Sequence, residues 1–141
     1  MKELSKPAQK VFAAAIDKLG KAQHVKIDNK PGNYMPLVVE LIGATFFVGS
    51  DTKFRVYSFA HYGEQNGDAM RDPDVTMLRC PTTGDLYPIT WRNDYVGIDN
   101  DTLVYNDAGA VTGVQEKGQK DIATFCTMWA VNLCEQQGLG K

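Results

Sequence analysis

The sequence predicts an α+β domain, an antiparallel β-meander of about five to seven strands with an N-terminal and a C-terminal amphipathic helix. Three observations predict this fold. A helical apolar repeat lies near each end of the chain, short runs of β-branched and aromatic residues lie between them, and turn residues separate those runs. Because no internal repeat and no long Pro- or Gly-rich linker divides the chain, we expect a single domain over residues 1–141.

The first helix is predicted to begin after Ser5 and to end near Gly20. Serine is a favoured N-cap, Pro7 suits the first helical turn, and glycine can end a helix in the left-handed conformation. Apolar residues recur between these points at three- and four-residue steps and form one stripe: Ala8, Val11, Phe12, Ala15, Ile16 and Leu19.

Strands are predicted over residues 24–27, 37–42, 45–48, 54–62, 75–80 and 86–92, and a further hairpin over residues 103–111. Gly43 fits a tight connection or a bulge between the second and third of these runs. In the run 54–62, Tyr57 and Phe59 share a face with His61, and the opposite face is also partly apolar. This run is therefore predicted to be a central strand.

The last helix is predicted over residues 120–137, with Gly138 as its C-terminal stop. Its apolar face comprises Ile122, Phe125, Cys126, Trp129 and Leu133. Trp129, the largest of these side chains, is expected to be the main anchor of the helix in the core.

Composition favours a cytoplasmic protein. The formal charge is −2, from 17 acidic and 15 basic residues, which argues against a general attraction to nucleic acid or to an anionic membrane. No apolar run reaches the roughly 18 residues of a membrane-spanning helix, and the polar N-terminus does not resemble a signal peptide. The three cysteines form no Cys-x-x-Cys pair and are interpreted as reduced thiols.

Polar residues are most concentrated between His61 and Asp74. The candidate functional residues in this stretch are His61, Glu64, Asn66, Asp68, Arg71 and Asp72. The structural interpretation is a hairpin loop, because Asn-Gly between two strands is a strong turn signal. On this interpretation Asp68 or Asp72 accepts hydrogen bonds from nearby backbone N–H groups, and Pro73 ends the loop.

The functional interpretation of the same stretch is a polar site. His61 would act as an acid or base, while Glu64 and Asp68 would hold a cation or orient the imidazole. His-x-x-Glu alone is not a metal signature, and in a continuous strand these two residues fall on opposite faces. We therefore predict no metal site and no cofactor.

A second polar cluster contains Arg92, Asn93 and Asp94. Arg92 could bind a carboxylate or phosphate group, with an aromatic neighbour offering a stacking face. The favoured interpretation is an internal ion pair, which would tie two loops at one end of the sheet. The pairs considered are Arg92 with Asp72 or Asp74, and Arg71 with Asp94.

Three segments of the sequence, AHYGEQNGD (residues 60–68), MRDPD (residues 70–74) and YPITWRND (residues 87–94), resemble a domain family of unknown function. The usual wording of that family is AHYYEQNGD-x-MRDP-E followed by YP-x-x-x-RND. The chain departs from it at Gly63, where a second tyrosine is common, and at Asp74, where glutamate is common. The resemblance implies a setting in bacterial mobile elements, that is phages, plasmids and integrative conjugative elements. It carries no catalytic residue.

The leading functional hypothesis is a small non-enzymatic binding protein of a mobile element, which interferes with host defence by binding a host protein or a small nucleotide. The alternative is a small hydrolase-like enzyme with a polar site formed by His61, Glu64, Asp68 and Arg92. Direct nucleic-acid binding on a sheet face is a third hypothesis, against which the net charge argues. Its phosphate-binding and stacking residues would be Arg55, Arg71, Arg79, Arg92, Tyr57, Tyr87 and Trp91.

Overall fold

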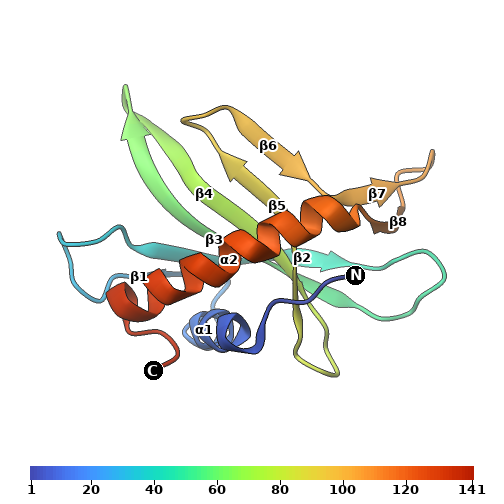
Figure 1. The fold of residues 1–141 in the computed structure, drawn as a ribbon, viewed down its shortest axis with the longest axis horizontal. Coiled ribbons are helices and arrows are strands. Elements are labelled where there is room, and N and C mark those ends of the chain that lie inside the picture. Colours follow the sequence, from blue (N-terminus) through green and yellow to red (C-terminus); the bar gives the residue numbers. More distant parts are fainter.

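The computed structural model describes residues 1–141 and confirms the predicted α+β meander (Figure 1). The helices are α1 (Lys6–Asp17) and α2 (Glu116–Gln137). The strands are β1 (His24–Ile27), β2 (Leu37–Thr45), β3 (Phe54–Gln65), β4 (Asp68–Arg79), β5 (Leu86–Asn93), β6 (Ile98–Asp101), β7 (Leu103–Tyr105) and β8 (Val111–Val114). No helix is long and apolar enough to cross a membrane.

The main sheet is antiparallel, and its six strands lie in the order β1-β2-β3-β4-β5-β6, so each pairs with its neighbour in sequence. Strands β7 and β8 form a separate two-stranded sheet, in agreement with the predicted hairpin over residues 103–111. Strands β3 and β4, with 12 residues each, are the longest and lie at the centre. The prediction of a central strand at β3 is confirmed.

The predicted break at Gly43 is a bulge rather than a connection. Strand β2 continues to Thr45, and its register with β3 shifts between Leu41 and Gly43. The strand predicted over residues 45–48 was wrong, since beyond Thr45 only Phe47 forms an isolated bridge, with Val111. Aromatic and β-branched residues favour extended backbone there, but no neighbouring strand continues alongside it.

Both helices cover the same face of the main sheet, and the principal core lies between these layers (Figure 1). At its centre, the ring centroids of Phe12 and Phe59 lie 5.0 Å apart, and those of Phe12 and Trp129 lie 5.6 Å apart. These three residues come from α1, β3 and α2, so Trp129 anchors the last helix as predicted. A smaller cluster of Phe54, Leu78 and Ile89 lies apart from this core.

The helix ends follow from their capping residues. The Ser5 side chain accepts a hydrogen bond from the backbone N–H of Ala8, and Gly138 ends α2 in the left-handed conformation with φ of 70°. Helix α2 begins at Glu116, four residues before the predicted start at residue 120. The apolar repeat does not reveal this first turn, because its buried residue is the polar Gln119, which donates to Pro88 O and accepts from Lys2 N.

Candidate functional site

The stretch from His61 to Asp74 forms the predicted hairpin, but the loop is much shorter than predicted, because most of the stretch belongs to the two strands. Strand β3 continues to Gln65, which pairs with Asp68 at the start of β4. Only Asn66 and Gly67 form the turn, with positive φ values of 54° and 84°. The turn signal was therefore correct, but the polar side chains on both faces of the arms concealed the strand pattern.

His61 is a buried structural residue rather than an acid or base exposed to a substrate. Its Nδ1 lies 2.9 Å from the carbonyl oxygen of Pro36, and its Nε2 accepts a hydrogen bond of 3.0 Å from Trp129 Nε1. Since Trp129 can only donate, Nε2 carries no proton and Nδ1 is the donor to Pro36. Burial lowers the pKa of His61 below its ordinary value. Both ring nitrogens are thus engaged within the protein.

Arg71 and Asp94 form an ion pair that joins the hairpin to the end of β5, and this was one of the predicted pairs. The Asp94 carboxylate accepts from Arg71 Nη2 at 2.8 Å and from the Arg71 backbone N–H at 2.7 Å. In return, the Asp94 backbone N–H donates to Arg71 O at 2.9 Å. The hydrogen bonds from Arg71 lower the pKa of Asp94, and the same contact raises the pKa of Arg71.

Two further contacts support this junction. Asn93 Nδ2 donates to Asp72 Oδ1 at 2.9 Å, so Asp72 accepts from a side chain of β5 rather than from nearby backbone as predicted. Arg92 Nε donates to Asp99 Oδ1 at 2.8 Å. The predicted pairs of Arg92 with Asp72 or Asp74 were therefore wrong, because strand β6, whose short polar sequence was not predicted as a strand, supplies the partner.

Gly63 has a specific role in the same region. A Cβ atom added at Gly63 would collide with the hydroxyl group of Tyr95, which lies over the β3 backbone. The Tyr95 side chain therefore occupies the space that a side chain at position 63 would need. This contact gives a steric reason for glycine at position 63.

The remaining candidate residues lie at the exposed end of the hairpin. Glu64, Asn66 and Asp68 are exposed, and the Asp68 side chain makes no ion pair. The structure thus does not bring together the four residues of the enzyme hypothesis. His61 points into the core, Glu64 and Asp68 lie near the turn, and Arg92 binds Asp99.

The stacking surface of the nucleic-acid hypothesis is also divided. Tyr57 is buried beneath the helices, and Trp91 packs against Phe125 of α2 with ring centroids 5.8 Å apart. Arg71 and Arg92 are engaged with aspartates. These side chains therefore do not form one open surface.

The face of the sheet away from the helices carries a group of residues that the sequence did not single out. In β3, Phe59 lies in the core beneath the helices, so the adjacent Ser58 and Ala60 face the opposite side. The register places Glu40 beside Ser58 and Asp74 beside Ala60. We define the Asp74 patch as Glu40, Ser58, Tyr62 and Asp74.

Asp74 is the distinctive member of this patch. Its side chain is buried, with the residue only 8 % exposed, and its Oδ1 accepts a hydrogen bond of 2.7 Å from Ser58 Oγ. The three ion pairs of the chain, Lys6–Asp85, Arg71–Asp94 and Arg92–Asp99, do not include Asp74. A carboxylate so far removed from water is normally paired with a cation.

Tyr62 and Glu40 complete the electrostatic character of the patch. The pKa of Tyr62 is raised, first by burial and then by the carboxylates of Asp74 and Glu40, while the nearby Arg71 opposes this rise. The two carboxylates therefore lie close enough to act on the Tyr62 hydroxyl group. Tyr62 is still 39 % exposed, so the patch combines an accessible aromatic ring with two carboxylates. This combination is suited to a positively charged group.

Comparison with known proteins adds a family but no activity. A family model described as a domain of unknown function, DUF6908, matches residues 9–139. The matched range includes the whole main sheet, α2 and most of α1. No curated protein and no solved structure matches the chain significantly.

Proposed function

The chain belongs to the DUF6908 domain family, and from its structure we propose that it is a binding protein whose Asp74 patch receives a basic side chain of a partner protein. The observation that carries the proposal is the buried Asp74 carboxylate, which has a hydrogen bond from Ser58 and no counter-ion within ion-pair distance, although Arg71 acts on it from further away. A lysine or arginine of a partner would supply that counter-ion. The wording of the resembled family has glutamate at this position, which retains the carboxylate.

A protein partner fits this patch better than a nucleotide. Phosphate groups would meet the carboxylates of Asp74 and Glu40, whereas an ammonium or guanidinium group could pair with Asp74 and lie over the ring of Tyr62. Arg92, the nearest arginine in the register with Asp74, is already engaged by Asp99. The patch thus favours one of the two partner classes expected for an accessory protein.

The biological part of the proposal is that the partner belongs to a host defence system and that the chain is encoded by a mobile element. Its support is the resemblance of residues 60–94 to proteins of phages, plasmids and integrative conjugative elements. Expression of the chain in a bacterium with a phage-defence system should raise the efficiency of phage plating. An unchanged plating efficiency in every defence background tested would contradict the proposed role against host defence. The proposal that the Asp74 patch binds a basic side chain would then depend on the binding test alone.

The binding test compares substitutions at the patch and at the hairpin turn. The tagged wild-type chain should retain a host protein from a lysate, and Asp74→Asn should reduce the retained amount by about tenfold, since it removes a charge at the contact. Asp68→Asn is the matched control, because Asp68 is an exposed aspartate outside the patch. Retention should also weaken as salt is added.

Thermal unfolding of each variant separates loss of binding from loss of folding. We expect Asp74→Asn to stay folded, because its side-chain amide keeps an oxygen that can accept a hydrogen bond from Ser58. Equal retention by wild type and Asp74→Asn would refute the patch as the binding site. Loss of retention in Asp68→Asn alone would assign binding to the hairpin turn instead.

A further inference from the structure

A long depression lies on the helical side of the molecule, between α2 on one side and α1 with the preceding residues on the other. It consists of two adjoining cavities of about 360 and 410 Å³, which share Ser5 and Thr127. We call it the helix groove. Along α2 its lining runs from Lys120 to Glu135, a length of roughly 22 Å at the helical rise per residue. This is the length of about four turns of a second helix.

The floor of the helix groove is apolar and built from small residues. Ala8 and Val11 of α1 and Ala123 and Ala130 of α2 are all buried in the floor and line the two cavities. Small side chains let another backbone approach closely. On the wall, the Val131 side chain is 55 % exposed and adds apolar surface to the lining of the second cavity.

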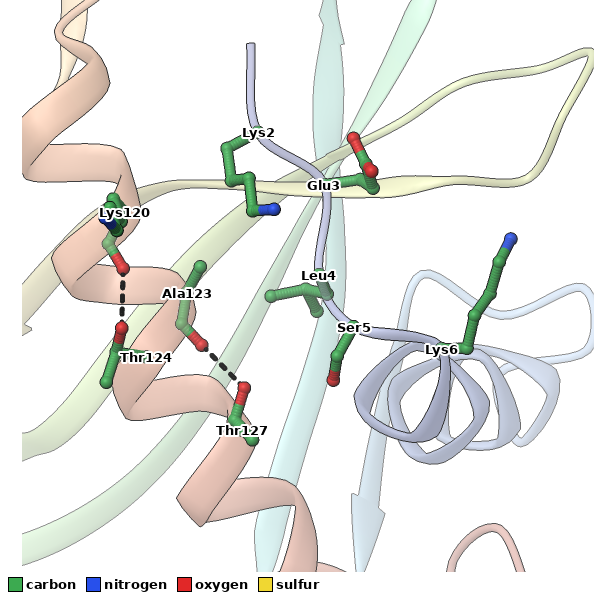
Figure 2. Close-up of a pocket in the computed structure, with 9 residues that line it drawn as sticks. All are labelled: Lys2, Glu3, Leu4, Ser5, Lys6, Lys120, Ala123, Thr124 and Thr127. Atoms are coloured by element: carbon green, nitrogen blue, oxygen red, sulfur yellow. Dashed lines mark hydrogen bonds between the residues drawn. The ribbon is translucent and has the colours of Figure 1, made fainter.

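Two threonines make the wall more apolar than their residue type suggests. The Thr124 hydroxyl donates to the Lys120 carbonyl oxygen at 3.0 Å, and the Thr127 hydroxyl donates to the Ala123 carbonyl oxygen at 3.1 Å. Figure 2 shows both hydroxyl groups directed along α2 in this way. Their hydrogen-bonding capacity is thus used within the helix, and the methyl groups remain for contact.

The rim of the helix groove is basic although the whole chain is acidic. Lys2, Lys6 and Lys120 line one cavity and Lys10 lines the other, against the two acidic residues Glu3 and Glu135. Figure 2 shows Lys120 on α2 at one side of the first cavity and Lys2 and Leu4 on the N-terminal segment at the other. Of the four lysines only Lys6 forms an ion pair, with Asp85 at 3.9 Å, and its side chain is 89 % exposed.

We propose that the helix groove binds an acidic amphipathic helix of a partner protein. The apolar stripe of that helix would lie on Ala8, Val11 and Ala130, and its flanking carboxylates would meet the lysines of the rim. The charge argues against pairing of two copies through this groove, because the same lysines would face each other. The inference does not depend on the Asp74 patch, which lies on the other face of the sheet.

The test uses the full chain and a designed probe. A fluorescein-labelled peptide with leucine at helical three- and four-residue spacing and glutamate on its flanks should bind, as measured by fluorescence anisotropy. A peptide with lysine in place of every glutamate, and a peptide with the same residues in scrambled order, should each bind at least about tenfold more weakly. Added salt should weaken binding of the acidic probe.

Substitutions locate the bound peptide. Val131→Lys places a charge on the apolar wall and should weaken the acidic probe about tenfold although it adds positive charge to the groove. Lys10→Glu should weaken it by a similar factor, whereas Lys117→Glu, on an exposed part of α2 outside the two cavities, should leave it unchanged. All three positions are exposed, so the variants should unfold at the wild-type temperature.

Three results would overturn the proposal. The first is equal binding of the acidic, basic and scrambled probes. The second is acidic-probe binding that Val131→Lys does not weaken. The third is a wild-type dimer in sedimentation velocity that becomes a monomer in Val131→Lys, which would assign the groove to a second copy of the chain.

Discussion

His61 illustrates how one buried contact determines the role of a residue. Its position beside a polar hairpin is typical of an acid or base, but each ring nitrogen has a protein partner. A protonated imidazole would turn an N–H toward the N–H of Trp129, which can only donate. The contact therefore requires neutral His61 and links β3 to α2.

We expect this requirement to make the stability of the protein depend on pH. The pKa of His61 is lowered from 6.5 in the folded chain, so the unfolded chain binds the proton more readily. The stability due to neutral His61 is fully present above pH 6.5, and it is lost as the pH falls from there toward the lower folded pKa. Urea denaturation between about pH 5 and 8 should show this decline.

His61→Gln should be less stable than wild type by about 1–3 kcal/mol near neutral pH, because it disturbs a buried hydrogen-bonded pair. The decline between pH 8 and 5 should become much shallower in this variant. His24→Gln is the matched control, since His24 is exposed and should leave the decline unchanged. A decline that persists in His61→Gln and disappears in His24→Gln would contradict the assignment.

At the scale of elements, the far part of the β3–β4 hairpin is held in place by the residues at the end of β5. Arg71, Asp72 and Gly63 of the hairpin contact Asp94, Asn93 and Tyr95, which are consecutive in sequence. One short segment thus holds both arms. The contact holds the part of the hairpin next to the Asp74 patch in a defined position.

Removal of the Asp94 charge should loosen the hairpin without unfolding the molecule. In Asp94→Asn, amide hydrogen exchange of residues 62–71 should accelerate several-fold at neutral pH, while the amides of Phe59 and Val75 keep their wild-type rates. Asp99→Asn is the control, because Asp99 lies on the outermost strand β6 and pairs with Arg92 of β5, away from the two arms of the hairpin. Unchanged exchange in Asp94→Asn would show that Arg71 does not hold the arms.

The same contact has a defined pH range in the wild-type chain. The pKa of Asp94 is lowered from 3.8, so its stabilising effect is present above pH 3.8 and is lost as the pH falls through the folded pKa. Wild-type exchange should therefore approach that of Asp94→Asn only under strongly acidic conditions.

The elements also show what the sequence could predict. Ser5, Gly138 and the Asn66–Gly67 turn act through local backbone preferences, and the structure has each where the sequence placed it. The pair of Arg71 and Asp94 was also anticipated. Arg92 was assigned the wrong partner because its aspartate lies on β6, which the sequence pattern does not mark as a strand.

The candidate site was harder to predict than the fold. Asp74 stands out only because it is buried without an ion pair, and burial of an aspartate depends on the neighbouring strands rather than on its local sequence. The helix groove is a further case. Its lining joins residues 2–11 to residues 120–140, and its apolar character depends on the hydroxyl orientation of two threonines.

At the scale of the whole molecule, the Asp74 patch and the lysine rim of the helix groove lie on opposite sides of the main sheet. The face away from the helices carries Asp74 and Glu40, and the helix groove on the opposite side carries four lysines on its rim. The net charge of −2 is a sum over the whole chain and does not reveal where these groups lie. If both binding proposals hold, a basic partner and an acidic partner would meet separate surfaces and could bind at the same time.

The order of the strands has a consequence for how the chain folds. Successive strands of the main sheet are joined by connections that range from two residues (66–67) to nine (28–36), so each pairing closes a short loop at low entropic cost. The helices, by contrast, lie at opposite ends of the chain and meet only in the folded core, as in the contact between the rings of Phe12 and Trp129. We expect the central hairpin to form in the transition state and the helices to dock later. In stopped-flow kinetics, Val75→Ala should then mainly slow refolding, whereas Trp129→Phe should mainly speed unfolding. Slower refolding in Trp129→Phe together with faster unfolding in Val75→Ala would indicate that the helices nucleate folding instead.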